Sequence, residues 1–137
     1  MAELQKRESV AGVAVKGDKL FVARRRPGGD LGGKWEFPGG KVRPGESHAG
    51  TLKREYLEEL SVPVEVGEKI GEARFVHGNT CFFLSALLVA LQSEDFSLKE
   101  HSEYRWVTFT ELEQLDFADS DRQIFPAIKK LFNAAHW

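Results

Sequence analysis

Four charged side chains lie close together in a segment whose pattern predicts a helix. Arg54, Glu55, Glu58 and Glu59 occur within Gly40–Val62, which reads GKVRPGESHAGTLKREYLEELSV. At about 100° per residue, the three glutamates share one helical face. Clustered carboxylates on a partly buried helix repel one another unless a hard cation such as Mg²⁺ lies between them. The glutamate face is therefore a candidate metal site.

The rest of this helix supports a packed position. Arg54 stands four residues before Glu58, so it can orient that carboxylate and balance its charge. An apolar arc that can pack on a sheet adjoins the acidic face and consists of Ala49, Leu52, Tyr56 and Leu60. The competing interpretation is a solvated acidic face, because such charge patterns are common on helices.

The spacing of these residues resembles the Nudix box, G-x5-E-x7-R-E-U-x-E-E-x-G-U, where U is aliphatic. Its first glycine and its charged positions are filled by Gly40, Glu46, Arg54, Glu55, Glu58 and Glu59. Tyr56 stands at an aliphatic position, and Ser61 replaces the final glycine, which would accept a positive φ at the helix end. Neither departure affects an expected metal ligand.

Segments outside the box extend the resemblance to the MutT-like branch of the Nudix hydrolases. The stretch Trp35–Lys41, WEFPGGK, precedes the helix as it does in that family. Glu100 lies six residues before Trp106, the spacing of a distal metal-ligand glutamate in MutT-like enzymes. Asp121, after Leu115-Asp116-Phe117, resembles the residue that contacts the nucleotide base.

The resemblance implies a single α+β domain over residues 1–137, a Nudix-type α/β/α sandwich with a mixed β-sheet between helices. It also implies a Mg²⁺-dependent pyrophosphohydrolase, with Mn²⁺ as a substitute, that cleaves nucleoside triphosphates to monophosphate and pyrophosphate. Expected substrates are oxidised dGTP or CTP and dCTP, cleared as nucleotide-pool housekeeping. The alternatives are hydrolysis of another nucleoside diphosphate derivative such as ADP-ribose, and a catalytically silent nucleotide-sensing module.

The same resemblance assigns roles along the chain. Expected metal ligands are the Gly39 carbonyl, Glu46, Glu55, Glu58, Glu59 and Glu100. Expected catalytic side chains are Glu55, Glu58 and Arg54, and the general base is open between Glu55, Glu58 and Glu100. Expected substrate contacts are Arg24, Arg25, Lys41, Phe82, Asp119 and Asp121.

Several of these residues have a simpler interpretation that stays open. Arg24 and Arg25 beside a glycine-rich loop suit phosphate binding or ordinary surface charge, and Lys41 suits a phosphate contact or an exposed strand. Glu100 suits an ordinary loop acid. Asp121 suits a helix N-cap, and Asp119 could take either part.

Composition bounds the remaining possibilities. The 137 residues suffice for one domain with a core, and a net charge of −2 offers no broad nucleic-acid footprint. The single cysteine, Cys81, suits a reducing cytosol and a small core residue. The N-terminus is polar, and no apolar run is long enough to span a bilayer. We therefore expect a cytoplasmic monomer or homodimer without a nucleic-acid or membrane partner.

Periodicity and turn signals predict the elements that position these residues. Val10–Val15 and Leu20–Ala23 form a hairpin, and the apolar run Thr80–Leu91 forms a strand buried on both faces. A further strand begins at Tyr104. The helix after it opens on a capping box of Thr110 and Glu113, and a last helix covers about Arg122–Ala134. None of the histidines, His48, His77, His101 and His136, has metal-ligand spacing, so none is assigned to a site.

Overall fold

The structure is a computed structural model that describes residues 4–134. The elements follow one another in the order β1 (Gln5–Lys16), β2 (Lys19–Arg25), β3 (Trp35–Glu36), β4 (Gly39–Lys41), α1 (His48–Leu60), β5 (Val64–His77), β6 (Thr80–Leu91), β7 (His101–Thr108), α2 (Phe109–Gln114), α3 (Asp119–Arg122) and α4 (Phe125–Ala134). Within the described residues, no helix is long and apolar enough to cross a membrane.

The strands form a mixed sheet in the order β3-β2-β1-β6-β5, with β4 added to β1 and β7 added to β2. β1 and β6 run parallel, and the other pairs are antiparallel. The predicted first hairpin is confirmed, because Val15 pairs with Leu20 and Lys16 with Lys19. β6 lies between β1 and β5 with apolar side chains on both faces, as the continuous apolar run predicted.

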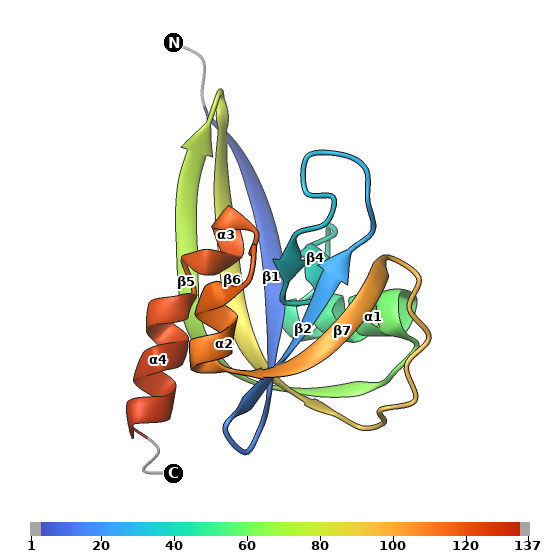
Figure 1. Ribbon diagram of the computed structural model, residues 1–137. Helices are drawn as coiled ribbons and strands as arrows, with labels where there is room; N and C mark the ends of the chain where they lie inside the picture. Colours follow the sequence, from blue (N-terminus) through green and yellow to red (C-terminus); the bar gives the residue numbers. More distant parts are fainter. Residues whose placement is uncertain (1–3, 135–137) are drawn as a thin grey trace.

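Helices cover both faces of this sheet (Figure 1). On one face, Leu52, Tyr56 and Leu60 of α1 are fully buried in one hydrophobic cluster. On the other face, a second cluster contains Leu112 of α2 and Ile128 of α4. The predicted α/β/α sandwich with a mixed sheet is therefore confirmed.

Local capping fixes both ends of α1. The Ser47 hydroxyl accepts a hydrogen bond from the Gly50 amide at 3.0 Å, which caps the first turn. At the other end Ser61 adopts φ 61° and ψ 29°, and its amide donates to the Leu57 carbonyl at 3.1 Å. The residue that replaces the glycine of the box thus takes the left-handed conformation that the glycine would have taken.

Two predictions at the junction of β7 and α2 are wrong. β7 begins at His101 rather than Tyr104, because the polar residues before Tyr104 still pair with β2. The capping box consists of Thr108 and Glu111 rather than Thr110 and Glu113: the Glu111 amide donates to the Thr108 hydroxyl, and the Glu111 carboxylate accepts from the Thr108 amide. β7 runs directly into α2, so the residue that ends the strand is the one that caps the helix.

The last helix is shorter than predicted. α4 begins at Phe125, and the four residues Asp119–Arg122 form the separate helix α3. Pro126 fits the first turn of α4, where a missing amide hydrogen costs nothing. This break separates Asp121 from α4 and leaves it beside β3.

β5 forms one edge of the sheet over 14 residues. Its pairing with β6 shifts register between Val66 and Lys69 and again between Lys69 and Gly71. β5 is therefore one continuous strand with two irregularities, which bend it along the sheet.

Candidate active site

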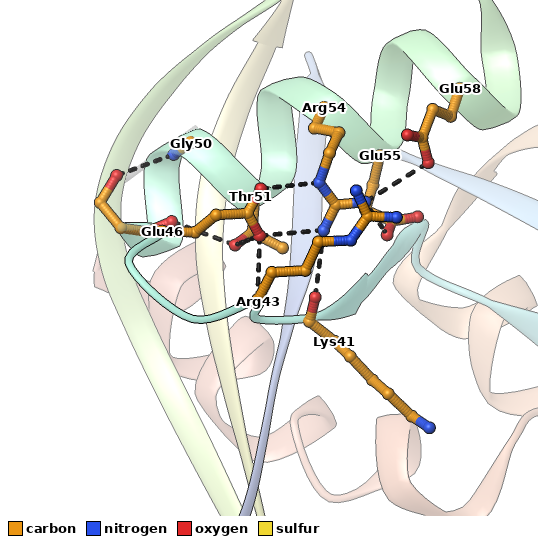
Figure 2. Close-up of polar contacts among 9 residues, drawn as sticks. Lys41, Arg43, Glu46, Gly50, Thr51, Arg54, Glu55 and Glu58 are labelled. Carbon is orange, nitrogen blue, oxygen red and sulfur yellow. Dashed lines mark hydrogen bonds and ion pairs between the residues drawn. The ribbon is translucent and has the colours of Figure 1, made fainter.

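Arg54 connects the acidic side chains of α1 with the loop before it (Figure 2). Its Nη1 donates to Glu55 Oε1 at 2.7 Å and to Glu58 Oε2 at 3.3 Å. Its Nη2 donates to the Lys41 carbonyl at 3.2 Å. A guanidinium has five donors in a fixed plane, so a single Arg54 side chain fixes three segments relative to one another.

Glu46 is the main partner of Arg54. Its two carboxylate oxygens accept from Arg54 Nε at 2.7 Å and Nη2 at 3.0 Å, and also from the Arg43 amide and the Thr51 hydroxyl. Arg54, followed by the Arg43 amide, lowers the pKa of Glu46 to about 2. Glu46 is thus a charged anchor for Arg54, and its predicted role as a metal ligand stays a prediction.

The three glutamates of the acidic face differ in exposure. The Glu58 side chain is 52% exposed and that of Glu55 is 16% exposed, whereas Glu59 is buried at 6%. Glu59 Oε2 is buried and has no hydrogen-bond partner. Burial first, and then the charges of Glu36, Glu55 and Glu100, raise the pKa of Glu59 to about 9.

Gly39 and Gly40 bring backbone against this face. A side chain at Gly40 would place its Cβ 2.6 Å from the Glu55 carboxyl carbon, and one at Gly39 would collide with the Val10 carbonyl on β1. β4 is held there by pairing with β1, where Ala11 lies opposite Gly39. The two glycines are required because the strand passes between β1 and the Glu55 carboxylate.

Glu100 reaches the same region from the loop before β7. Its charge contributes to the raised pKa of Glu59, and the Lys99 amide donates to the Glu59 carbonyl at 3.1 Å. The structure therefore holds the segment that carries Glu100 against α1 at Glu59. It leaves Glu58 on the exposed side and Glu46 behind Arg54.

Two further residues of this cluster were missed in the sequence. Glu36, Glu59 and His101 each offer one potential ligand atom, and these atoms lie within 4.8 Å of one another. His101, to which the sequence assigned no role, is fully buried in this group. Histidine spacing gave no signal, since these ligands come from three separate segments. Only the adjacency of Glu36 to the WEFPGGK glycines and of His101 to Glu100 pointed to them.

Hydrogen bonds already satisfy Glu36. Its Oε1 accepts from Arg25 Nη1 at 3.3 Å, and its Oε2 lies 2.8 Å from His101 Nε2. The unpartnered oxygen of the cluster is that of Glu59. Carboxylate oxygens such as those of Glu55 and Glu59, with Glu55 against the Gly40 backbone of β4, are the hard donors that Mg²⁺ prefers, so these residues fit a divalent cation.

The predicted phosphate contacts occupy different places. Arg25 borders the cluster, where its guanidinium pairs with Glu36. Arg24 Nε donates to the Gly33 carbonyl at 3.0 Å, which closes the glycine-rich loop after β2. The Lys41 side chain is exposed and extends away from Arg54 (Figure 2). The structure thus brings Arg25 to the carboxylate cluster and leaves Arg24 at the loop.

The structure separates the two candidate base contacts. Asp121 is buried, and its Oδ2 accepts from the Phe37 amide at 2.8 Å, whereas Asp119 is exposed. Burial first, then the charge of Glu36, raise the pKa of Asp121 to about 7. The N-cap interpretation is wrong for both, because Ala118 occupies the N-cap of α3.

Phe82 lies on β6, a strand that carries no carboxylate of its own. Its ring stacks on Phe75 of β5, with centroids 4.9 Å apart. Strand alternation places Phe82 on the same face as Leu84, which packs in the cluster under α2 and α4. Phe82 therefore borders the side of the sheet that carries Asp121.

Known proteins show the same architecture. The model of the NUDIX domain family matches residues 5–128, so the chain belongs to this family, whose hydrolases generally use divalent metal ions. Among curated proteins, a Mycobacterium tuberculosis protein provisionally named as an 8-oxo-dGTP diphosphatase is 35% identical over 129 residues, 92% of this chain and 90% of the relative. The CTP pyrophosphohydrolase of Escherichia coli is 32% identical over 90% of this chain and 92% of its own.

Among solved structures, the solution structure of the E. coli ORF135 protein superposes with a TM-score of 0.84 at 29% identity. The match covers 96% of this chain and 94% of that protein. The likeness includes nearly all of both molecules, so the helices and strands that hold the carboxylate cluster belong to the shared fold.

Proposed function

We propose that this chain is a Mg²⁺-dependent pyrophosphohydrolase that cleaves nucleoside triphosphates to nucleoside monophosphate and pyrophosphate. One observation carries the proposal: a buried oxygen of Glu59 lacks a hydrogen-bond partner amid several carboxylates, with Glu55 packed on the Gly40 backbone and Glu36 and Glu100 contributing negative charge. A buried carboxylate is costly unless a cation or proton accompanies it. A site that binds magnesium phosphate complexes would use this arrangement.

Different residues of the chain would bind the metal ion and orient its ligands. Glu55, Glu59, Glu100 and the Gly39 carbonyl would hold Mg²⁺, with Glu58 completing the set from the exposed side. Bound there, the ion would neutralise phosphate charge and activate water for attack. Arg54 fixes Glu55 and Glu58, and Glu46 fixes Arg54, so the carboxylates are oriented before the substrate arrives. The general base stays open between Glu55, Glu58 and Glu100.

The nucleotide would extend from this cluster towards Asp121. Arg25, whose guanidinium pairs with Glu36, is one candidate to bind the phosphates, and Arg24 and Lys41 are further candidates. The relatives named for 8-oxo-dGTP and for CTP support oxidised dGTP or CTP-type substrates. We place the activity in the cytoplasm, in a monomer or homodimer, since the single cysteine suits a reducing compartment.

A pyrophosphate-release screen tests the proposal. The purified protein is incubated with normal, oxidised and methylated nucleoside triphosphates, and with ADP-ribose, with Mg²⁺ or with EDTA. We expect Mg²⁺-dependent pyrophosphate release from at least one triphosphate. ADP-ribose turnover yields AMP and ribose 5-phosphate, so it is followed as AMP release by chromatography. Turnover of ADP-ribose alone, or turnover that is unchanged by EDTA, would refute the proposal.

Asp121 is the residue that we expect to choose the base. When ionised it offers only acceptors, which suit the amino groups of cytosine or guanine, and when protonated it can also donate. Asp121→Asn should therefore re-rank kcat/KM among CTP, dGTP and oxidised dGTP by about tenfold, or roughly 1.4 kcal/mol. Asp119→Asn, at the exposed neighbour, is the matched control and should keep the ranking. An unchanged ranking in Asp121→Asn would exclude base selection by this residue.

A further inference from the structure

Arg26, the third arginine at the end of β2, binds three successive carbonyl groups of the loop before β7. Its Nη2 donates to the Leu98 carbonyl at 3.3 Å and its Nε to the Lys99 carbonyl at 3.1 Å. Its backbone amide donates to the Glu100 carbonyl at 3.3 Å. The Arg26 side chain therefore donates to the backbone of this loop rather than being free to bind a phosphate group.

The three carbonyl groups that bind Arg26 belong to the end of an irregular loop, residues 92–100. The loop is also anchored to α1, because the Ser97 amide donates to the Leu60 carbonyl at 3.0 Å and the Lys99 amide to the Glu59 carbonyl at 3.1 Å. Further back, the Phe96 ring packs on Phe21, with centroids 5.0 Å apart. Arg26 supplies the contacts between this anchored loop and the end of β2.

We propose that Arg26 is a positioning residue that holds Glu100 at the metal cluster; this inference rests on the proposed function. Glu100 is exposed, and the side chain of an exposed loop residue explores many directions unless its backbone is fixed. Arg26 fixes the carbonyls of Glu100 and of the two residues before it. The carboxylate then starts from one backbone geometry when a cation binds.

Guanidinium geometry makes this role specific to arginine. Nε and Nη2 donate in one plane to two neighbouring carbonyls, an arrangement that an ammonium group on a flexible stem does not reproduce. Arg26→Lys keeps the charge and loses the paired donors. A phosphate-binding role would tolerate lysine, whereas a positioning role would not.

Two measurements test the proposal: the Mg²⁺ dependence of activity, and Mg²⁺ binding to the nucleotide-free protein by isothermal titration calorimetry, in which each Arg26 variant should raise the Mg²⁺ Kd by about tenfold. We expect Arg26→Ala and Arg26→Lys each to raise the Mg²⁺ concentration for half-maximal activity by about tenfold, the usual range for loss of a residue that orients a metal ligand. Nucleotide KM at saturating Mg²⁺ should stay unchanged. Lys130→Gln, which removes an exposed charge on α4, is the control and should not alter the Mg²⁺ titration.

The double variant Arg26→Ala/Glu100→Gln isolates the coupling. If Arg26 acts through Glu100, the Arg26→Ala change adds nothing in the Glu100→Gln background. A raised nucleotide KM that persists in that background would overturn the inference and assign Arg26 to the substrate. A changed titration in Glu100→Gln with none in the Arg26 variants would overturn it too, while leaving the proposed function intact. No change in Glu100→Gln itself would instead remove Glu100 from the metal site.

Discussion

At the scale of single residues, Glu59 is the side chain on which the acidic cluster centres. It is the most buried of the three glutamates of the α1 face, and the charges of Glu36, Glu55 and Glu100 add to the effect of burial. A carboxylate in this position holds a proton or a cation. Each neighbouring negative charge raises the free energy of the ionised Glu59 carboxylate, and so strengthens its need for a bound proton or cation.

Glutamine at the two less exposed positions of α1 tests the metal cluster directly. Glu55→Gln and Glu59→Gln should each lower kcat by at least about a hundredfold, the usual cost of losing one electrostatic stabiliser, roughly 2.7 kcal/mol. Folding should survive, since each change removes repulsion. Steady-state kinetics in saturating Mg²⁺ measure the effect, with Glu113→Gln on the exposed side of α2 as the control. Near-wild-type turnover in either variant would exclude that side chain as a ligand.

Glu36 and His101, which were not identified from the sequence, show the limit of what the spacing of residues along the chain can predict. Glu55, Glu58 and Glu59 were found because helical periodicity turns sequence distance into a shared face. Glu36 and His101 join them across the sheet through the pairing of β2 with β3 and β7, and no periodicity links those three segments. The same limit explains Glu46, whose spacing matched a family pattern while its partners became visible only in the fold.

At the scale of elements, α1 depends on a strained residue at its end. Ser61 has φ 61°, the only positive φ of a non-glycine residue in the described part of the chain. Glycine adopts this conformation without the clash that a Cβ introduces. Ser61→Gly should therefore stabilise the protein by about 0.5–1 kcal/mol.

Chemical denaturation with an unchanged m-value is the measurement for Ser61→Gly. Ser61→Ala, which keeps the Cβ, is the matched control and should gain no such stability. A destabilised glycine variant would show that the serine side chain makes a contact worth more than the backbone strain.

Tyr56 and Gly12 form a matched pair between α1 and β1. The Tyr56 hydroxyl donates to the Gly12 carbonyl at 3.1 Å, and a Cβ at Gly12 would lie 2.5 Å from that hydroxyl oxygen. A tyrosine fits the aliphatic position of the motif because β1 offers no side chain opposite it. Gly12→Ala should cost about 1–3 kcal/mol by overpacking.

The double variant Gly12→Ala/Tyr56→Leu should recover part of the stability lost in Gly12→Ala, because leucine leaves room for the added methyl group. Thermal unfolding of the four proteins of this cycle measures the coupling. Strictly additive losses would show that the two positions do not share one packing site.

At the scale of the whole molecule, stability of the metal-free protein should fall as pH rises. The native state keeps a proton on Glu59 up to about pH 9 and on Asp121 up to about pH 7. The unfolded chain releases both near pH 4. Between these limits the native state binds more protons than the unfolded state, so each step up in pH favours unfolding.

Thermal unfolding in EDTA from pH 5 to pH 9 measures this dependence. Glu59→Gln, which is neutral throughout, should lose much of the slope, and Glu59→Gln/Asp121→Asn should lose more. Asp119→Asn, at an exposed site, is the control and should parallel the wild type. A Glu59→Gln protein that loses stability as steeply as the wild type would exclude Glu59 as the source.

The fold as a whole was more predictable than its boundaries. The first hairpin, the α1 face and the β6 strand carry regular apolar patterns, and their packing follows from those patterns. The start of β7 and the capping box at Thr108 depend on pairing with β2 and on where that pairing ends. Thr108 and Thr110 are each followed three residues later by a glutamate, so both fit a capping box in the sequence. The end of the pairing between β7 and β2 determines that Thr108 is the cap.

The shape of β5 bears on how copies of this protein meet. A long strand at a sheet edge exposes unpaired amide and carbonyl groups, which invite another chain to continue the sheet. Two register shifts bend β5, and exposed charges follow its length at Glu65, Glu68, Lys69, Glu72 and Arg74. The bends and the exposed charges of β5 should prevent a second copy from pairing with this edge and so extending the sheet into a fibre. We therefore expect any self-association at high protein concentration to occur through other surfaces.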